Sequence, residues 1–284
     1  MSLTDIEIHK LEARAKEIRL SIIDMLLEAG SGHTAGPLGM ADVFTALYFK
    51  ILKHDPSSPD WAHRDRLILS NGHICPVLYA TMAHAGYLPV NELKTLRKFR
   101  SRLQGHPHRE FLKSVETSSG PLGSGLSQAT GMALADRMMG GMPKNFYCLM
   151  GDGEMNEGNV WEALLTLSKY NLTNVITIID RNGIQIDGRT EDVMPLESLS
   201  EKLKAFNFNV LEIDGHNMME IVDAVNIAKS NSINPTAIIA HTIPGKGWSQ
   251  IEGDYHWHGK APNSEEAKKA IQSIRTMGGK INLE

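Results

Sequence analysis

The chain has 284 residues, 42% of them hydrophobic and 22% charged, and its formal net charge is −4 at pH 7. This length and apolar share suit one large α/β domain or two small ones with a substantial core. The weakly acidic balance excludes the basic footprint typical of nucleic-acid binding, and no apolar run reaches the roughly 18–20 residues that span a bilayer.

The N-terminal half is predicted to be mainly helical. Residues 1–20 lack the apolar stretch of a signal peptide, and the two cysteines, Cys75 and Cys148, are too few for a disulfide framework. Both features favour a cytoplasmic protein with free, buried thiols. Apolar residues three and four positions apart predict a first helix over 4–29, which Gly30 is placed to end. The elements that follow are predicted in this order: a glycine-rich loop at 31–41, a helix reaching 52, a short strand within 65–73, helices over 76–86 and 91–98, and a loop at 101–125.

Strands and helices alternate in the second half. They are predicted, in chain order, as a helix over 127–139, a strand over 146–150, a helix over 157–170, a strand over 175–180, a helix over 196–205, a strand over 208–213, a helix over 217–230, a strand over 236–241 and a helix over 264–276. This alternation is typical of βαβ units, so the fold class is α/β, a mostly parallel sheet with helices on both faces. Without an internal repeat or a linker-like change of composition, a single domain over 1–284 is expected.

Two glycine-punctuated acidic turns follow two of the predicted strands. The first is GDGEMNEG at 151–158, and the second is DRNGIQIDG at 180–188. The strands of a βαβ unit run parallel, so both turns are expected at the same edge of the sheet, where open α/β folds bind ligands.

The side chains in these turns favour a divalent cation bound to a diphosphate. Asp152 supplies a carboxylate, Asn182 an amide oxygen and Ile184 a backbone carbonyl, and Mg²⁺ prefers such oxygens together with phosphate and water. Spacing alone leaves Asp180 and Asp187 as rival ligands, and a lone GDG or Asn-Gly is also a common tight turn. Three glycines let the backbone approach a phosphate and adopt positive φ: Gly151, Gly153 and Gly183.

The order of these and further motifs resembles that of the transketolase family. The chain carries, in the family's order, SGHTAGPLGMA, LSNGH, GHPHRE, SSGPLGSGLSQATGMA, GDGEMNEGNVWEAL, DRNGIQIDG, DGH and WHGKAPN. The resemblance covers nearly the whole chain and is to the N-terminal, diphosphate-binding half of transketolase, in the form that occurs as a separate subunit. It implies the thiamine-diphosphate-binding (PP-type) version of the α/β fold.

The resemblance implies a cofactor and the residues that hold it. Thiamine diphosphate would bind with Mg²⁺, or with Ca²⁺ or Mn²⁺, and the metal would be held by Asp152, Asn182 and the carbonyl of Ile184. The residues implied for the rest of the cofactor are His73, Gly120, Pro121, Leu122, Gly151, Gly153, Glu154 and His258.

The resemblance also implies catalytic residues. His33, His106 and His258 would serve proton transfers at the sugar hydroxyls, a task for which imidazole is suited by its ordinary pKa of about 6.5. Glu157 would take part through a subunit contact that couples two cofactor sites, although the helix dipole equally explains an acid in a first helical turn. The sequence departs from the family at Thr34, where proline is more common.

The implied activity is the transfer of a two-carbon ketol unit from a ketose, usually a sugar phosphate, to an aldose. In transketolases the glutamate that activates the cofactor lies on a second domain, so we expect a separate C-terminal subunit in an α2β2 assembly, with no nucleic-acid or membrane partner. The alternatives are another thiamine-diphosphate subunit, similar to deoxyxylulose-phosphate synthase or to the 2-oxo acid dehydrogenase E1 α chain, and a non-catalytic regulatory chain. The histidine set favours the ketose-handling branch, and the intact pair Asp152 and Asn182 favours a catalytic chain.

Overall fold

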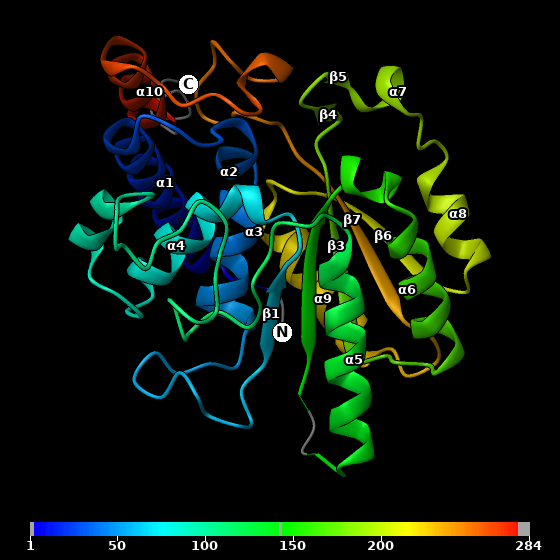
Figure 1. Ribbon diagram of the computed structural model, residues 1–284. Coiled ribbons are helices and arrows are strands. Elements are labelled where there is room, and N and C mark those ends of the chain that lie inside the picture. Colours follow the sequence, from blue (N-terminus) through cyan, green and yellow to red (C-terminus); the bar gives the residue numbers. More distant parts are fainter. Residues whose placement is uncertain (1–2, 142–143, 278–284) are drawn as a thin grey trace.

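A parallel sheet lies between two helical layers in the computed structural model, which describes residues 3–141 and 144–277 (Figure 1). The sheet has five strands in the order β1-β2-β3-β7-β6, and all neighbours are parallel. Their bounds are β1 (Arg66–Leu69), β2 (Phe146–Gly151), β3 (Val175–Arg181), β6 (Asn209–Asp214) and β7 (Thr236–His241). A short antiparallel pair, β4 (Ile184–Gln185) and β5 (Gly188–Arg189), stands apart from this sheet.

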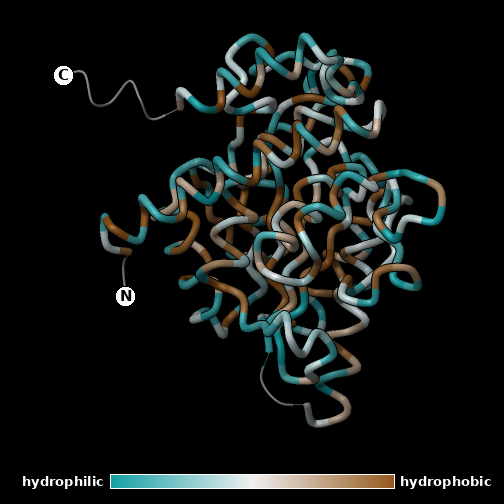
Figure 2. Tube along the Cα trace, turned by 90° about the vertical axis from the view of Figure 1, so that its left-hand side faces the viewer, coloured by the Kyte–Doolittle hydropathy of each residue, from teal (hydrophilic) through white to brown (hydrophobic). Residues whose placement is uncertain are grey.

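Alternation of side chains along the strands explains the two layers. On β2, Tyr147 and Leu149 belong to one buried cluster, while Phe146, Cys148 and Met150 belong to the other. Successive side chains of a strand point to opposite faces, so a strand that is apolar throughout needs helices on both sides. Figure 2 shows the resulting distribution, with apolar segments inside and polar ones outside.

The helices divide between these two faces. One cluster packs α1 (Asp5–Ala29), α2 (Ala35–Gly39), α3 (Ala41–Ala46), α4 (Cys75–His84), α9 (Met218–Ser230) and α10 (Ser264–Thr276). The other packs α5 (Ser124–Met138), α6 (Gly158–Lys169) and α8 (Leu199–Ala205). Shorter helical turns are η1 (Leu47–Ile51), η2 (Gly72–Ile74), η3 (Val90–Thr95), η4 (Gly153–Asn156), α7 (Thr190–Val193) and η5 (Tyr255–Trp257).

The handedness of the crossovers places these helices. The chain moves in one direction across the sheet from β1 to β2, β3 and then β6, and it returns from β6 to β7. Right-handed crossovers therefore put α5, α6 and α8 on one face and α9, which joins β6 to β7, on the other.

Local signals set the ends of the first helix as predicted. Thr4 and Glu7 form a capping box at its start, and Gly30 ends it with a left-handed φ of 64°. The expectation for the cysteines is also confirmed, since Cys75 and Cys148 are buried and free.

Several short elements differ from the sequence prediction, among them α2, which lies within the predicted loop at 31–41. Residues 91–98 were expected to be an α-helix, but Val90–Thr95 forms a 3₁₀ helix instead. The β4–β5 hairpin and α7 lie where no element was predicted.

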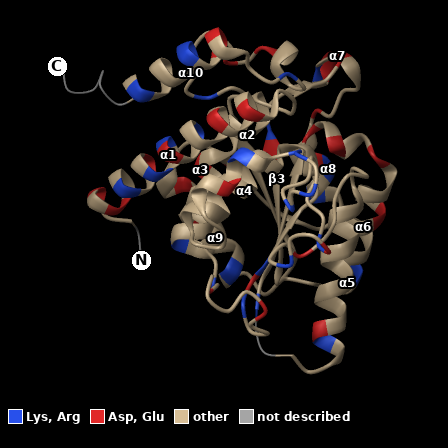
Figure 3. Ribbon diagram, turned by 60° about the vertical axis from the view of Figure 1, so that its left-hand side comes forward, with Lys and Arg blue, Asp and Glu red and all other residues tan. Residues whose placement is uncertain are grey.

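No helix in the described part of the chain is both long and apolar enough to cross a membrane. Charges of both signs are interspersed along α1 and α10 (Figure 3).

Candidate active site

The turns after β2 and β3 meet at the carboxyl edge of the sheet, as their place in a βαβ unit predicts. Gly151, the last residue of β2, is in register with Asp180 on β3. Beyond these residues, the Gly183 N–H donates to Asp152 Oδ2 over 2.8 Å, across 31 positions of sequence. The fold thereby sets the Asp152 carboxylate against the turn that carries Asn182.

The Asp152 carboxylate is buried and held by several donors. Oδ2 accepts from Arg181 Nη1 and Gly183 N, both at 2.8 Å, and from Thr190 Oγ1 at 3.2 Å. Among the described residues, Oδ1 has one donor, the Gly153 N–H at 2.7 Å. Burial raises the pKa of Asp152, against the hydrogen bonds from Arg181 and Gly183, which lower it. One carboxylate oxygen is thus fixed by the protein, and the other keeps capacity to bind a ligand.

Arg181 lies within the second turn motif but was not predicted as a site residue, yet it organises this corner. Its guanidinium donates to Asp152 at 2.8 Å, to Glu191 at 2.6 Å and to Glu197 at 2.7 Å. These partners lie 29, 10 and 16 positions away, so no local pattern brings them together. Arg181 therefore ties the carboxylate of the first turn to the segment around α7.

Asn182 and the rival carboxylates are distinguished by their surroundings. Asn182 Nδ2 donates to Asp180 Oδ2 at 2.8 Å, and its Oδ1 accepts the Ile184 N–H at 3.0 Å. Asp180 also accepts from the Thr242 hydroxyl, and burial raises its pKa to about 7. Asp187 is exposed between β4 and β5 and lies outside the pocket lining. Of the two rivals, only Asp180 reaches the site, and both of its oxygens already accept hydrogen bonds from the protein.

Four of the predicted histidines share one pocket with these turns. The rings of His33, His73 and His258 form a triangle with centroids 4.9, 5.6 and 5.1 Å apart. His106 lines the same pocket. The other predicted residues in the lining are Gly120, Leu122, Gly151, Asp152, Gly153, Glu154, Asn182 and Ile184. Asn71, which was not predicted, also lines it, and its buried Oδ1 has no partner among the described residues.

Burial favours the neutral form of these imidazoles. Burial, together with the charges of His258, Arg97 and His106, lowers the pKa of His33 to about 4. Burial likewise lowers the pKa of His73, His106 and His258. Nδ1 of His33 and Nδ1 of His258 are buried without a hydrogen-bond partner among the described residues. Neutral imidazoles with unmet hydrogen bonds are suited to accept protons from a bound ligand.

Thr34 joins the loops of His33 and His258, which are distant in sequence. Its hydroxyl donates to the Lys260 carbonyl oxygen at 2.6 Å and is fully buried. A proline at this position has no side-chain donor and could not make this bond. The departure from the family's pattern therefore supplies a direct link between two sides of the pocket.

Glu154 braces the loops around the pocket. Its Oε1 accepts from the Ser70 hydroxyl and the Gly123 N–H, and its Oε2 accepts from the Gly151 N–H at 3.1 Å. Burial raises its pKa. Because protein donors occupy both oxygens, Glu154 shapes the ends of β1, β2 and the loop before α5.

Two predicted residues lie outside the pocket lining. Pro121 is exposed between Gly120 and Leu122, which do line it. Glu157 is exposed at the start of α6, a helix that leaves the sheet edge to pack on α5. The structure therefore does not bring Glu157 to the histidines of its own chain, and a role through a subunit contact stays a prediction.

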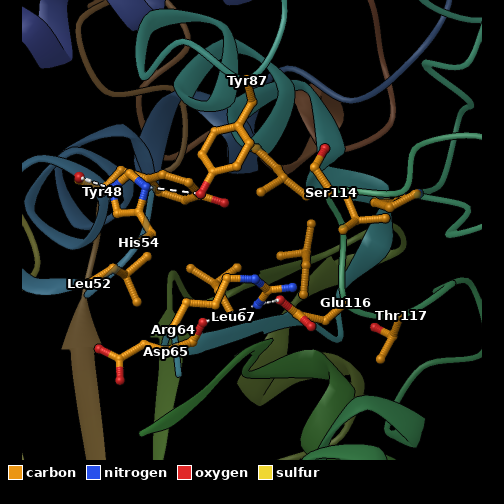
Figure 4. A pocket seen from close by; sticks show the side chains of 14 residues that line it. Tyr48, Leu52, His54, Arg64, Asp65, Leu67, Tyr87, Ser114, Glu116 and Thr117 are labelled. Carbon is orange, nitrogen blue, oxygen red and sulfur yellow. Dashed lines mark hydrogen bonds and ion pairs between the residues drawn. The ribbon is translucent and has the colours of Figure 1, made fainter. Parts of the chain in front are cut away.

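The loop that carries His106 is anchored by a second, buried cluster (Figure 4). Arg64 and Glu116 form an ion pair in which both side chains are less than 10% exposed, at 8% and 9%. The Ser119 N–H donates to the Pro107 carbonyl at 3.0 Å, and this hydrogen bond joins the two ends of segment 107–119. A cavity of about 30 Å³ beside this pair has room for one water molecule. The long loop predicted from the sequence is thus pinned beside His106.

The donors at the sheet edge fit a hard divalent cation with a diphosphate. In residues 3–141 and 144–277, no group of three or more His, Cys, Asp or Glu side chains is arranged to hold a metal. The predicted ligand oxygens are Asp152 Oδ1 and the Asn182 amide oxygen, each of which accepts one backbone N–H, and the Ile184 carbonyl. Together they carry a single formal charge. A cation on so few protein oxygens takes its other ligands from phosphate and water, as Mg²⁺ does.

Comparison with known proteins identifies the family to which the chain belongs. Residues 11–278 match the family described as "Transketolase, thiamine diphosphate binding domain". The chain therefore belongs to the transketolase family and carries the domain that binds thiamine diphosphate.

Two relatives that the chain matches over nearly their whole length show that it is an N-terminal transketolase subunit. The chain is 40% identical to the 6-deoxy-6-sulfo-D-fructose transketolase subunit of Clostridium sp. (strain MSTE9), over 94% of this chain and 97% of that protein. It is 37% identical to an apulose-4-phosphate transketolase subunit from Phocaeicola vulgatus, over 98% of each chain.

Single-chain transketolases are matched over only part of their length. Human transketolase is 36% identical over 94% of this chain, which spans 42% of that protein. The crystal structure of transketolase from Campylobacter jejuni is 37% identical and superposes with a TM-score of 0.89 over 94% of this chain and 43% of that chain. The predicted fold class is thereby confirmed, and the protein is a subunit of a transferase.

Proposed function

We propose that this subunit transfers a two-carbon ketol unit from a ketose phosphate to an aldose, together with a separate C-terminal subunit. The observation that supports this most strongly is that one pocket holds both acidic turns and four histidines. A metal–diphosphate site alone would suit many enzymes. Added imidazoles, positioned to exchange protons with hydroxyl groups, suit the chemistry of sugars.

The metal side of the proposal rests on the fit of the donor set. Mg²⁺, with Ca²⁺ or Mn²⁺ as substitutes, would be held by Asp152, Asn182 and the Ile184 carbonyl. The diphosphate and the adjoining ring would lie against His73, Gly120, Leu122, Gly151, Gly153 and His258, while Pro121 is exposed between Gly120 and Leu122. Glu154 would act by holding these loops.

The reaction divides between the cofactor and the histidines. When bound, thiamine diphosphate supplies the reactive carbon that attacks the ketose carbonyl. His33 and His106 would accept protons from the sugar hydroxyls as the carbon–carbon bond breaks and return them when the new bond forms. His258, whose ring lies beside those of His33 and His73, would orient the substrate. Accepting the hydroxyl protons needs imidazoles that are neutral before the substrate binds.

A partner is supported by the relatives and by the surface beside the pocket. The chain spans about two fifths of single-chain transketolases, whereas the relatives that it matches over their whole length are named as transketolase subunits. Ile186 in the lining is 64% exposed, and Met194 nearby in sequence is 56% exposed. We propose that a C-terminal subunit covers this edge in an α2β2 assembly. We also propose that Glu157 lies at a subunit contact in this assembly, with a second copy of this chain. A single domain over 1–284 and a cytoplasmic location stay predictions.

The test of the metal site is a substitution of its carboxylate with a matched control. Asp152→Ala removes the one anionic ligand and is expected to abolish Mg²⁺-dependent binding of thiamine diphosphate. Asp187→Asn removes an exposed carboxylate of the β4–β5 hairpin, outside the pocket lining, and is expected to bind like the unmodified chain. Calorimetry with Mg²⁺ and cofactor, in the presence of the partner subunit, measures both. Unchanged affinity in Asp152→Ala would sink the assignment.

A further inference from the structure

Arg97 lies against both loops that carry the pocket's proton-accepting histidines. A Cβ atom built on Gly105 would lie 2.9 Å from Arg97 Cζ, and one built on Gly32 would lie 3.8 Å from Arg97 Nε. These glycines directly precede His106 and His33. The guanidinium therefore packs on the backbone that leads into two of the four histidines, although its own side chain is outside the pocket lining.

The backbone fixes where this guanidinium sits. Arg97 adopts a left-handed φ of 60°, just after η3, and its N–H donates to the Leu103 carbonyl at 2.9 Å. On the other side, the Cys75 thiol on α4 donates to the Gly105 carbonyl at 3.2 Å. Gly105 is thus held between α4 and Arg97. A side chain at Gly105 would displace the arginine, since ordinary Cβ contacts are longer than 3.4 Å.

The charge of Arg97 has no counter-ion among the described residues. The neighbouring cations are paired: Lys98 with Glu28, and Arg102 with Glu92 at 2.5 Å. No described residue forms an ion pair with Arg97 or accepts a hydrogen bond from its side chain. An unneutralised cation disfavours a second positive charge on a nearby imidazole.

The groups that face His106 and His33 are mostly other imidazoles. His33 lies beside His73 and His258, with ring centroids 4.9 and 5.6 Å away. Arg97 is the permanently charged group that also lowers the pKa of His33, after burial and His258. After burial, Arg97 is also the named cause that lowers the pKa of His106. Both histidines thus lie in the field of one fixed cation.

We propose that Arg97 is a positioning residue for proton transfer, because its unpaired guanidinium packs on the backbone before His106 and His33 and disfavours a positive charge on these two imidazoles. Only the predicted effect on turnover rests on the proposed function, and the effect on the pKa of the two histidines does not. Removing the cation lets the pKa of both imidazoles rise toward the ordinary value of about 6.5. A larger share of each is then protonated at pH 6, and proton acceptance fails on the acid side of the profile.

The first experiment titrates the histidines of the full chain by NMR, with no cofactor or partner. Arg97→Gln is expected to raise the pKa of His106 and His33, while Arg97→Lys keeps the charge and stays close to the unmodified chain. Arg100→Gln is the matched control, because Arg100 has a similar left-handed φ of 63° on the same segment. Unchanged histidine titrations in Arg97→Gln, or an equal shift in Arg100→Gln, would overturn the proposal.

Salt provides a second measurement that needs no variant to fold. The Arg97 side chain is exposed, so its field is screened by ions. In the unmodified chain the pKa of His106 is expected to rise between low salt and about 1 M salt, and a value independent of salt would contradict the proposal. In the assembled enzyme, kcat/KM of Arg97→Gln should fall about threefold or more at pH 6 relative to pH 8. A shifted titration without any activity in the assembly would instead point to failure of the proposed function.

Discussion

At the scale of single residues, the orientation of each histidine decides its use. His106 lines the pocket, whereas His108, two residues on, packs beside Phe111 with the rings tilted and their centroids 4.7 Å apart. Its Nδ1 accepts the Glu110 N–H at 3.3 Å. The same loop thus carries one imidazole that faces the site and one that serves the loop's own packing.

This contrast gives a matched pair of variants. His106→Ala is expected to lower kcat by about 10²-fold, the typical loss of a general acid or base, with cofactor affinity nearly unchanged. His108→Ala should retain most of the activity. Steady-state kinetics of the assembled enzyme, with calorimetry for the cofactor, measure both effects. Full activity in His106→Ala would reduce this histidine to a structural role.

Motifs predict residues of this kind when the side chain and its neighbours are close in sequence. The two turns and the four histidines each stand beside glycines or strand ends, so spacing identifies them. Arg181 and Arg97 could not be identified in that way. The first acts through partners 10 to 29 positions away, and the second through packing on Gly32 and Gly105. Such contacts depend on the tertiary fold and not on local spacing.

At the scale of elements, the loop between η3 and α5 depends on its buried ion pair. Glu116→Ala removes the carboxylate and leaves the Arg64 guanidinium buried without its partner. Breaking a buried pair in this way typically costs about 3–5 kcal/mol. Urea unfolding of the full chain should show this loss, while Glu110→Ala, an exposed acid of the same loop, should stay within about 0.5 kcal/mol of the unmodified chain. Equal stability of the two variants would contradict the anchoring role.

Elements that bury a periodic apolar face are the ones that the sequence predicts. The sheet strands and the long helices α1 and α9 follow such a pattern. The β4–β5 hairpin and α7 do not, because polar bonds hold them: Thr190 donates to Asp152 at 3.2 Å, and Glu191 accepts from Arg181 at 2.6 Å. An element defined by such bonds has no hydrophobic period to detect. Of these elements, β4 and the turn after it line the site, through Ile184, Gln185 and Ile186.

At the scale of the whole molecule, the order of strands explains why chemistry gathers at one edge. Every strand of the main sheet is parallel to its neighbours, so the turns after β2, β3 and β7 emerge on the same side. His258 follows β7, Asn182 follows β3 and Asp152 follows β2. Residues separated by about a hundred positions are thereby brought into one pocket. Its exposed rim at Ile186 suits a surface that a second subunit covers.

The central claim is that this chain is one half of a transketolase site, and reconstitution tests it most directly. The purified chain would be mixed with a separately expressed C-terminal-type transketolase subunit, Mg²⁺ and thiamine diphosphate, and ketol transfer from a ketose phosphate would be assayed alongside light scattering. We predict no turnover by either chain alone, turnover by the mixture, and a mass that fits two copies of each subunit. Robust ketol transfer by the isolated chain would contradict this account.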